Sequence, residues 1–294
     1  ILGYLSTGKM PWKHCVEDDG RIRGYINNIG TVTHRCSHSS PNLGNIPKKG
    51  SLGQRCRKLF IVGSGRKLIG CDAKGLELRM LAEALYPYDG GAYWNTILDG
   101  DIHSANQDAA GLDERDQAKT FIYAWLYGAG VEKLGRIVKG GASEGKRLKA
   151  AFLTNTPGIA DWIDDMKFKA SRDGCVYGMD GRRVSLPYKR SERTGEMELC
   201  TYVAPNYKLQ TDGAIVMKQF VVNLDEALIE HELDAGIVLD VHDEVQVDVL
   251  DDPHTIQTCQ ELMLASMLEA GKVFNLHGPL EGDCAVGDNW METH

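Results

Sequence analysis

The 294-residue sequence predicts an α+β fold, in which helices are combined with antiparallel strands. Two β-branched runs, 237–241 and 244–249, are joined by a tight polar turn, a pattern typical of a hairpin. A short apolar strand at 67–71 is followed by a helix at 76–85, whose apolar residues recur at helical spacing. Residues 206–231 are predicted to form a long helix. The chain contains no internal repeat and no low-complexity tract.

The N-terminal third begins with a predicted hairpin. Residues 21–26 and 31–33 are expected to pair, because Asn27-Asn28-Ile29-Gly30 between them are typical turn residues. Residues 39–47, rich in Ser, Pro, Asn and Gly, are expected to form an irregular loop.

The middle of the chain is predicted to be mainly helical. A helix at about 114–127 follows from an acidic capping pair at its start and from Gly128 at its end. Further helices are expected at 132–137, at 144–152 and, after Pro157, at 158–170. Residues 176–186 predict a second hairpin around Asp180-Gly181, and a last helix is expected at 253–270.

Composition places the chain among ordinary globular proteins. Hydrophobic residues make up 43% and charged residues 25%. No apolar run approaches the roughly 18 residues of a membrane span, so no membrane association is expected. The eight cysteines are scattered without a C-x-x-C pair, which favours single buried thiols in a reducing cytosol over a zinc site or disulfides. The opening residues lack the features of a signal peptide, and a chain that starts at Ile1 is interpreted as an excised fragment.

Charge is distributed unevenly along the chain, whose net charge is −8. Residues 221–294 contain 17 of the 41 acidic side chains and one of the 33 basic ones, so their net charge is −16 and that of the preceding part is +8. This asymmetry fits a protein that presents a basic surface to phosphates and gathers acids elsewhere, around cations. The alternative for most of the acids is a solvated helix face.

Two aspartates at the ends of apolar strand runs are candidate metal ligands. Asp72 follows the strand at 67–71, and Asp243 lies in the turn of the later hairpin, 171 residues further on. Nucleotidyl transfer to a hydroxyl uses two cations about 4 Å apart, which carboxylates bridge. Hard oxygen ligands suit Mg²⁺. Taken singly, each aspartate is more often a turn former.

The helix between these aspartates carries two cations and an aromatic residue on one stripe. Arg115, Lys119 and Tyr123 are spaced by four residues, so successive positions advance by only about 40°, with Tyr127 at the edge of the stripe. Such a stripe could hold a triphosphate and stack on a base or sugar. For this stretch alone, an exposed basic helix with buried aromatic residues is the alternative.

Together these motifs resemble the polymerase domain of the family A DNA polymerases, in particular the replicative enzymes of short-tailed phages. Asp72 with 75–79 is similar to motif A, the helix with Arg115 and Lys119 to motif B, and 242–244 to motif C. The resemblance runs from about residue 20 to 290. Supporting similarities are found at 33–35, 41–47, 100–103 and 210.

The resemblance implies a right-hand polymerase fold with an antiparallel palm sheet, helical fingers and a largely absent thumb. The implied domains are the end of the thumb at 1–19, the palm at 20–85 and 201–294, and the fingers at 86–200. The implied activity is that of a template-directed DNA polymerase, a nucleotidyltransferase of DNA replication that uses two Mg²⁺ ions. Its partners would be primer-template DNA, deoxynucleoside triphosphates and a processivity factor acting through the missing thumb. Its location would be cytoplasmic, in a bacterial host cell if a phage encodes it.

The resemblance also implies roles for individual residues. Asp72 and Asp243, with the carbonyl of Ala73, would bind the metal ions, Glu244 would support them, and Lys119 would join the catalytic group. A larger set would contact the phosphates and the sugar of the incoming nucleotide or lie beside the templating base: His103, Arg115, Lys119, Tyr123, Glu77 and Tyr127. Within this set, Glu77 would exclude a 2′-hydroxyl.

Contacts with primer-template DNA are implied at a third set. Arg35, Asn206, Gln210 and His242 would follow the minor groove at the primer end, where acceptors common to all base pairs test fit rather than sequence. Arg57 and Arg182 are expected to add to the basic lining. His34, Tyr202 and Asp212 depart from the family pattern.

Two main alternative functions remain open from the sequence. One is a single-subunit RNA polymerase, which can share the two aspartates and the Lys-Tyr-Gly helix; Glu77 distinguishes it. The other is a fragment that binds primer-template DNA without independent turnover. A two-metal nuclease is a weaker option, because it would not need the stripe at 115–123.

Overall fold

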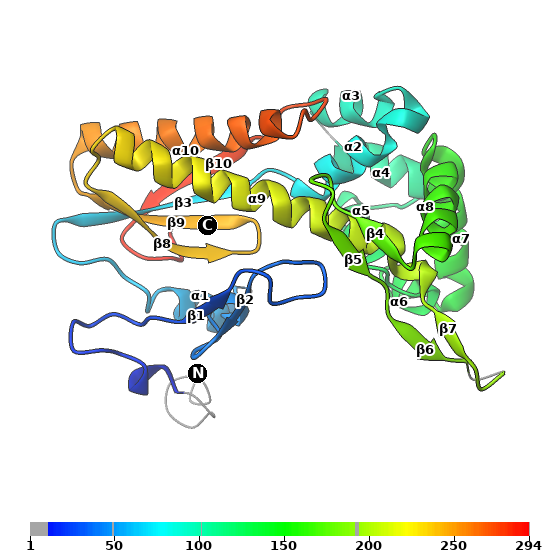
Figure 1. Ribbon diagram of the computed structural model, residues 1–294, viewed down its shortest axis with the longest axis horizontal. Coiled ribbons are helices and arrows are strands. Elements are labelled where there is room, and N and C mark those ends of the chain that lie inside the picture. Colours follow the sequence, from blue (N-terminus) through cyan, green and yellow to red (C-terminus); the bar gives the residue numbers. More distant parts are fainter. Residues whose placement is uncertain (1–10, 49, 101, 192–193, 294) are drawn as a thin grey trace. The chain divides into compact units, whose positions relative to one another are not determined.

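The computed structural model describes residues 11–48, 50–100, 102–191 and 194–293 (Figure 1). The chain divides into two compact units. Unit 1 consists of residues 1–74, 214–274 and 279–294, and unit 2 consists of residues 75–213 and 275–278. Part of the predicted thumb remnant, residues 1–10, lies outside the described residues.

Unit 1 is built on a four-stranded antiparallel sheet with the order β10-β3-β9-β8. Its strands are β3 (Arg66–Ala73), β8 (Ala235–Val241), β9 (Glu244–Leu250) and β10 (Gly282–Gly287). Val245, Val247 and Val249 of β9 are completely buried, because this strand lies between two neighbours and is covered on that face. The predicted hairpin and the antiparallel character of the sheet are confirmed.

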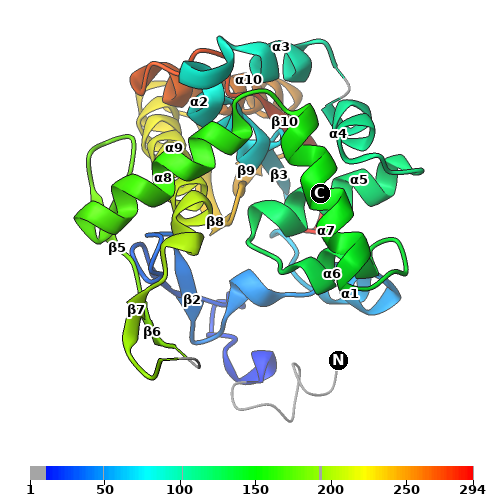
Figure 2. The same ribbon diagram turned by 90° about the vertical axis from the view of Figure 1, so that its right-hand side faces the viewer.

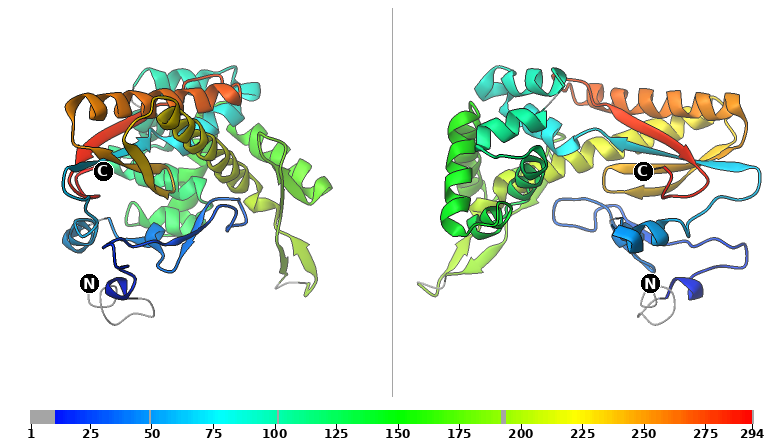
Figure 3. Two further views of the ribbon diagram at one scale, coloured as in Figure 1. Left: turned by 60° about the vertical axis from the view of Figure 1, so that its left-hand side comes forward. Right: turned by 180° about the vertical axis from the view of Figure 1, so that it is seen from behind.

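Helix α10 (Pro253–Val273) packs on β3, β9 and β10, and the unit 1 part of α9 (Ala204–Glu230) runs beside it (Figures 1 and 3). Asn223 of α9 donates to the carbonyl of Ser266 in α10 at 3.3 Å. Asp252 caps α10: its carboxylate accepts the backbone N–H of Thr255 at 2.9 Å, and Pro253 occupies the first turn, where no backbone donor is needed.

The N-terminal part of unit 1 contributes short elements and an aromatic cluster. The elements are a 3₁₀ turn at Trp12–His14, β1 (Tyr25–Asn27), β2 (Ser37–Ser39), a 3₁₀ turn at Leu43–Asn45 and α1 (Gly50–Arg57). Trp12, Phe60 and Trp290 meet edge to face, with ring centroids 5.3 and 5.7 Å apart in turn. The cluster also includes Leu68 and Val241 of the sheet, so it joins this segment to the strands.

One predicted pairing in this segment is wrong. Strand β1 pairs with Ser37–Ser39, not with residues 31–33. Thr31 instead forms a local turn: its hydroxyl accepts the backbone N–H of Arg35 at 2.9 Å, and its carbonyl accepts that of His34 at 3.0 Å. Local side-chain hydrogen bonding of this kind competes with a strand ladder.

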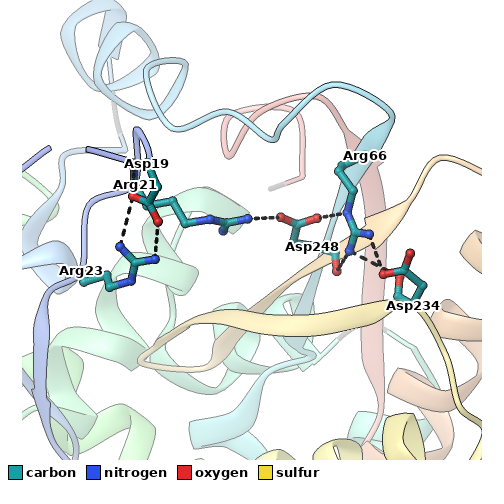
Figure 4. A network of polar contacts seen from close by, with 6 residues as sticks. All are labelled: Asp19, Arg21, Arg23, Arg66, Asp234 and Asp248. Atoms are coloured by element: carbon teal, nitrogen blue, oxygen red, sulfur yellow. Dashed lines mark hydrogen bonds and ion pairs between the residues drawn. The ribbon is translucent and has the colours of Figure 1, made fainter. Parts of the chain in front are cut away.

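A polar network ties residues 19–23 to the sheet (Figure 4). Asp248 of β9 accepts from Arg66 of β3 at 2.6 Å and from Arg21 at 3.3 Å. Arg66 also pairs with Asp234 at 2.6 Å, and Arg23 pairs with Asp19 at 2.5 Å. Because the Asp248 side chain is only 8% exposed, its charge is compensated by two guanidinium groups rather than by water.

Unit 2 is mainly helical (Figure 2). Its helices are α2 (Leu76–Asp89), α3 (Ala92–Leu98), α4 (Ile102–Ala110), α5 (Arg115–Leu126), α6 (Val131–Arg136), α7 (Ala142–Asn155), α8 (Ile159–Asp173) and the start of α9. Two small hairpins, β4 (Cys175–Tyr177) with β5 (Arg183–Ser185) and β6 (Tyr188–Arg190) with β7 (Met197–Leu199), complete it, together with a 3₁₀ turn at Thr201–Val203. The predicted helices and the Asp180-Gly181 hairpin are confirmed, whereas α3, α4 and the β6–β7 hairpin were not predicted.

Helices α6 and α7 approach each other through glycine. An added Cβ at Gly145 of α7 would lie 1.7 Å from the carbonyl oxygen of Val131 and 2.9 Å from the backbone nitrogen of Gly135. The two backbones therefore lie too close for any side chain at position 145. Phe121 of α5 and Phe152 of α7 meet edge to face at 5.6 Å in the core beside them.

None of the helices within the described ranges combines the length and the apolar character required to cross a bilayer.

Candidate active site

The segments that carry the two candidate metal ligands lie side by side, where β3 ends and β9 begins in the unit 1 sheet. Asp72 is near the end of β3, and Asp243 lies in the turn between β8 and β9. The backbone N–H of Ala73 donates to the carbonyl of Asp243 at 2.9 Å, which joins the two segments directly. Both aspartates are half-buried. The sequence separates them by 171 residues, and strand pairing brings them together.

The turn that carries Asp243 is tightly held. His242 has a φ of 59°, a left-handed conformation that lets two antiparallel strands connect within two residues. A ring nitrogen of His242, Nε2, lies 3.1 Å from the carbonyl oxygen of Gly44. Position 243 is therefore fixed by the turn on one side and by the hydrogen bond from Ala73 on the other.

Strand register places further carboxylates beside Asp72. Glu244 is directly opposite Asp72 on β9, and Asp283 is directly opposite it on β10, so all three side chains leave the same face of the sheet. Within residues 11–48, 50–100, 102–191 and 194–293, no three His, Cys, Asp or Glu side chains form a group that could hold a metal ion. Asp72 and Asp243, with the backbone oxygen of Ala73, offer the hard oxygen donors that Mg²⁺ prefers.

Glu244 is buried, in contrast to the aspartates. Its side chain is 4% exposed and pairs at 3.4 Å with Arg57, whose side chain is 7% exposed. This burial corrects the expectation for Arg57, because a guanidinium enclosed within unit 1 and paired with Glu244 does not line a surface. Trp290 Nε1 also donates to Glu244.

Lys48 is a residue that sequence reasoning missed. Loss of hydration is the largest influence on its amine and lowers its pKa, and Arg57 lowers the pKa further. The negative charges of Asp72, Asp243 and Glu244 act in the opposite direction. A cation is therefore present near these carboxylates, in a loop where the sequence shows only a pair of lysines after Pro47.

Helix α5 in unit 2 presents the predicted stripe. Arg115 and Lys119 are exposed and Tyr123 is half-buried, whereas Phe121 and Ile122 point into the core. His103 of α4 lies beside the stripe, with its ring centroid 6.4 Å from that of Tyr123. The structure thus places His103 beside Tyr123. Asp101, which belongs to the same sequence similarity as His103, lies outside the described residues.

A second group in unit 2 surrounds the end of α5. The hydroxyl of Tyr127 donates to Glu77 Oε1, and the Glu77 carboxylate is buried. Asn206 donates to the carbonyl of Leu126 and accepts from Gln210 at 3.0 Å. The end of α5 is therefore hydrogen-bonded both to α2, through Tyr127 and Glu77, and to α9, through Asn206.

Arg35 and Arg182, which are also predicted to contact DNA, each lie in a local turn. Arg35 lies in the turn closed by Thr31, and Lys218 Nζ donates to the carbonyl of the preceding His34. Arg182, in the turn of the β4–β5 hairpin, pairs with Asp180 at 2.6 Å. Among the departures from the family pattern, Asp212 is enclosed: burial raises its pKa, although Lys208 pairs with it at 2.8 Å.

Comparison with known proteins assigns the family. The model of "DNA polymerase family A" matches residues 5–292. The chain is 36% identical to the DNA-directed DNA polymerases of Enterobacteria phage T3 and Escherichia phage T7, in each case over 100% of this chain and 44% of the relative.

A solved structure is similar over nearly the whole chain. The POL domain of Pol1 from M. smegmatis, in complex with DNA primer-template and dNTP, has a TM-score of 0.84 and 28% identity. The match covers 96% of this chain and 50% of that one. The chain thus spans about half the length of the relatives it matches. On the strength of the family match, the chain belongs to DNA polymerase family A.

Proposed function

We propose that this chain is the catalytic region of a template-directed DNA polymerase, which joins a deoxynucleoside triphosphate to the 3′-hydroxyl of a primer. The observation that carries the proposal is the hydrogen bond between Ala73 and Asp243, which joins the segments bearing the two aspartates at one sheet edge. Family membership supports it, as does the similarity to a polymerase domain solved with primer-template and dNTP.

Asp72, Asp243 and the carbonyl of Ala73 would hold two Mg²⁺ ions. The fit rests on their chemistry, because two partly desolvated carboxylates and a carbonyl are hard oxygen donors on rigid strand ends. Bound there, the ions would lower the pKa of the attacking hydroxyl and hold the departing pyrophosphate. Glu244 would support the turn rather than face the ions, because its carboxylate is enclosed.

The unit 2 groups would bind the incoming nucleotide. The exposed cations Arg115 and Lys119 would hold its phosphates, helped by His103, and Lys119 would stabilise the charge that develops on the leaving group. Tyr123 would contact the sugar. The hydrogen bond between Glu77 and Tyr127 would fix a carboxylate where it closes the space for a 2′-hydroxyl. Such selection of deoxy sugars would distinguish a DNA polymerase from an RNA polymerase.

The primer-template duplex would be read at its minor groove. Arg35, Asn206, Gln210 and His242 carry the donors that the shared minor-groove acceptors require. Residues 20–85 and 201–294 would form the palm and residues 86–200 the fingers, with 1–19 as the end of the thumb. Arg182 would join the duplex lining only after its pair with Asp180 opens.

The test is primer extension with four deoxynucleotides in Mg²⁺. Asp72→Asn and Asp243→Asn should each lower the extension rate by at least about 100-fold, the scale of losing one electrostatic stabiliser of a transition state. Asp251→Asn is the matched control, because Asp251 is an exposed aspartate just beyond the opposite end of β9.

Binding of primer-template DNA, measured by fluorescence anisotropy across salt concentrations, should persist in both variants, because phosphate contacts remain. Near-normal extension by either variant would refute the assignment of the site. DNA binding by the unmutated chain without any extension would favour the alternative of a fragment that lacks independent turnover.

A further inference from the structure

We propose that Arg57 and Trp290 are positioning residues, which hold the Asp243 turn in place by clamping the buried carboxylate of Glu244. The proposal rests on the proposed function, because it concerns the metal-binding turn of that site. We call Arg57, Glu244, Gln246, Trp290 and Thr293 the Glu244 clamp. All of them are buried and all lie in unit 1.

Both carboxylate oxygens of Glu244 accept from the clamp. Oε1 accepts from the indole Nε1 of Trp290 and from Gln246 Nε2, the latter at 2.6 Å. Oε2 faces Arg57 Nη1 at 3.4 Å. A buried carboxylate is stable only when it is paired and hydrogen-bonded, and these three donors meet that requirement for Glu244.

The donors are themselves fixed. The guanidinium carbon of Arg57 lies 4.2 Å from the centroid of the Trp290 ring, within range of a cation–π interaction. Thr293 donates to Gln246 Oε1 at 2.8 Å, and the same hydroxyl lies 3.3 Å from the carbonyl of Trp290. The contacts form a closed loop in which each side chain is oriented by another, and such a network has little freedom to rearrange.

The clamp is anchored to the segment before β3 and to β3 itself. The backbone N–H of Trp290 donates to the carbonyl of Phe60 at 3.0 Å. Gly70 of β3 is opposite Gln246, and an added Cβ there would lie 2.4 Å from both Gln246 Nε2 and the Thr293 carbonyl oxygen. The clamp therefore packs directly against β3, two residues before Asp72.

Position along the chain explains why the clamp matters for Asp243. Glu244 is the first residue of β9 and is bonded directly to Asp243, while Asp72 is its partner across the sheet. Fixing the Glu244 side chain therefore fixes the backbone that carries one metal ligand beside the strand that carries the other. Partners that orient metal ligands in this way typically change metal affinity or activity by about 10- to 100-fold when they are removed.

The test uses two clamp variants and a matched control. Trp290→Phe keeps an aromatic ring but loses the indole N–H, and Arg57→Lys keeps the charge but loses the planar fork. Trp12→Phe is the same substitution as the first, in the same aromatic cluster, on the far side of Phe60. Mn²⁺ binding is measured by electron paramagnetic resonance on the full chain without DNA or nucleotide. The Mn²⁺ binding that is present in the unmutated chain and absent from Asp72→Asn is assigned to the candidate metal site.

Trp290→Phe and Arg57→Lys should weaken the Asp72-dependent binding of Mn²⁺ by about 10- to 100-fold, while Trp12→Phe should leave it within about twofold. Melting temperature measures the purely structural cost, which Trp12→Phe should share. Equal Mn²⁺ affinity in the clamp variants and the control would overturn the proposal, and so would the lack of any Asp72-dependent binding in the unmutated chain.

The outcome is separable from that of the proposed function. If the unmutated chain binds Mn²⁺ at Asp72 but extends no primer, the proposed polymerase activity fails, while the comparison of Mn²⁺ affinities still decides the role of the clamp. If Arg57→Lys does not fold, Trp290→Phe alone decides it, because that substitution removes a single donor and leaves the charge pair intact.

Discussion

Replacing Gly145 by alanine sets two effects of opposite sign against each other. In an ordinary helix the change stabilises by about 1 kcal/mol, because glycine has the greater backbone freedom to lose. At Gly145, however, the new Cβ would lie 1.7 Å from the carbonyl oxygen of Val131, where ordinary contacts begin at 3.4 Å. Since the obstacle is backbone, no rotamer change can relieve the overlap, and α6 must move away from α7.

The balance of these effects gives the expected size. Overpacking costs up to about 3 kcal/mol in well-packed sites, so a net loss of about 2 kcal/mol remains after the propensity gain. For a chain of this size each kcal/mol corresponds to about 2–4 °C, and the melting temperature should fall by about 4–8 °C. Thermal unfolding followed by circular dichroism measures the shift.

Gly213 of α9 provides the matched control. It also lies inside a helix, but an added Cβ would meet only side-chain atoms of Leu76 and Met80, the nearest at 3.4 Å. Gly213→Ala should therefore raise the melting temperature by about 2–4 °C. A Gly145→Ala protein that melts at or above the unmutated one would refute the reasoning that backbone contact decides the sign.

Three further predictions concern sugar selection, strand register and helix capping. Glu77→Ala should raise ribonucleotide use in primer extension by about tenfold or more, and equal use of both sugars by the unmutated chain would contradict a sugar-excluding role. Mild oxidation should join Cys71 to Cys284, because these cysteines are directly opposite in β3 and β10, where Cα atoms are about 4.5–5.5 Å apart and a disulfide can form. Peptide mass spectrometry should detect this disulfide in the unmutated chain and not in Cys284→Ser. A disulfide to another cysteine would argue against the register. Asp252→Ala should lower the melting temperature at neutral pH. The hydrogen bonds from Thr255 hold the pKa of Asp252 below its usual 3.8, so the capping contribution is present above pH 3.8 and is lost as the pH falls through the lowered pKa. The difference in melting temperature between the variant and the unmutated chain should therefore be smaller at about pH 2 than at about pH 7, and a constant difference would exclude a charged cap.

Strong local patterns predicted much of the fold. Helix α5 and the β8–β9 hairpin are set by periodicity, by the left-handed Gly128 that follows the helix and by turn residues within about fifteen positions, so a single sequence contains what is needed. The predicted acidic cap is not formed, because no side chain among the described residues caps the start of α5. Residues 31–33 have strand-like composition, but the Thr31 hydroxyl finds a backbone partner four residues away, and the chain turns instead. β10 carries a glycine at each end and owes its place to pairing with β3, a contact that no local pattern contains.

In the candidate site, too, some residues could be predicted from local patterns and others only from the fold. Asp72, Asp243 and the α5 stripe could be predicted because each motif is short and stands on a recognisable element. Arg57 was misassigned because its basic character is visible in the sequence and its burial is not. Trp290 gave no local signal, since its indole N–H acts on a carboxylate 46 residues earlier in the chain.

The alternation of side chains along β3 has a consequence for length variation in this family. Cys71 and Asp72 are consecutive, so one faces Cys284 on the α10 side of the sheet while the other shares a face with Glu244. Inserting one residue upstream within this strand would place the Cys71 thiol where the carboxylate belongs, and deleting one would place Ala73 there, so no substitution elsewhere could restore it. Insertions and deletions should therefore be absent from β3 and tolerated at exposed connections such as residues 28–32, all of which are open to solvent.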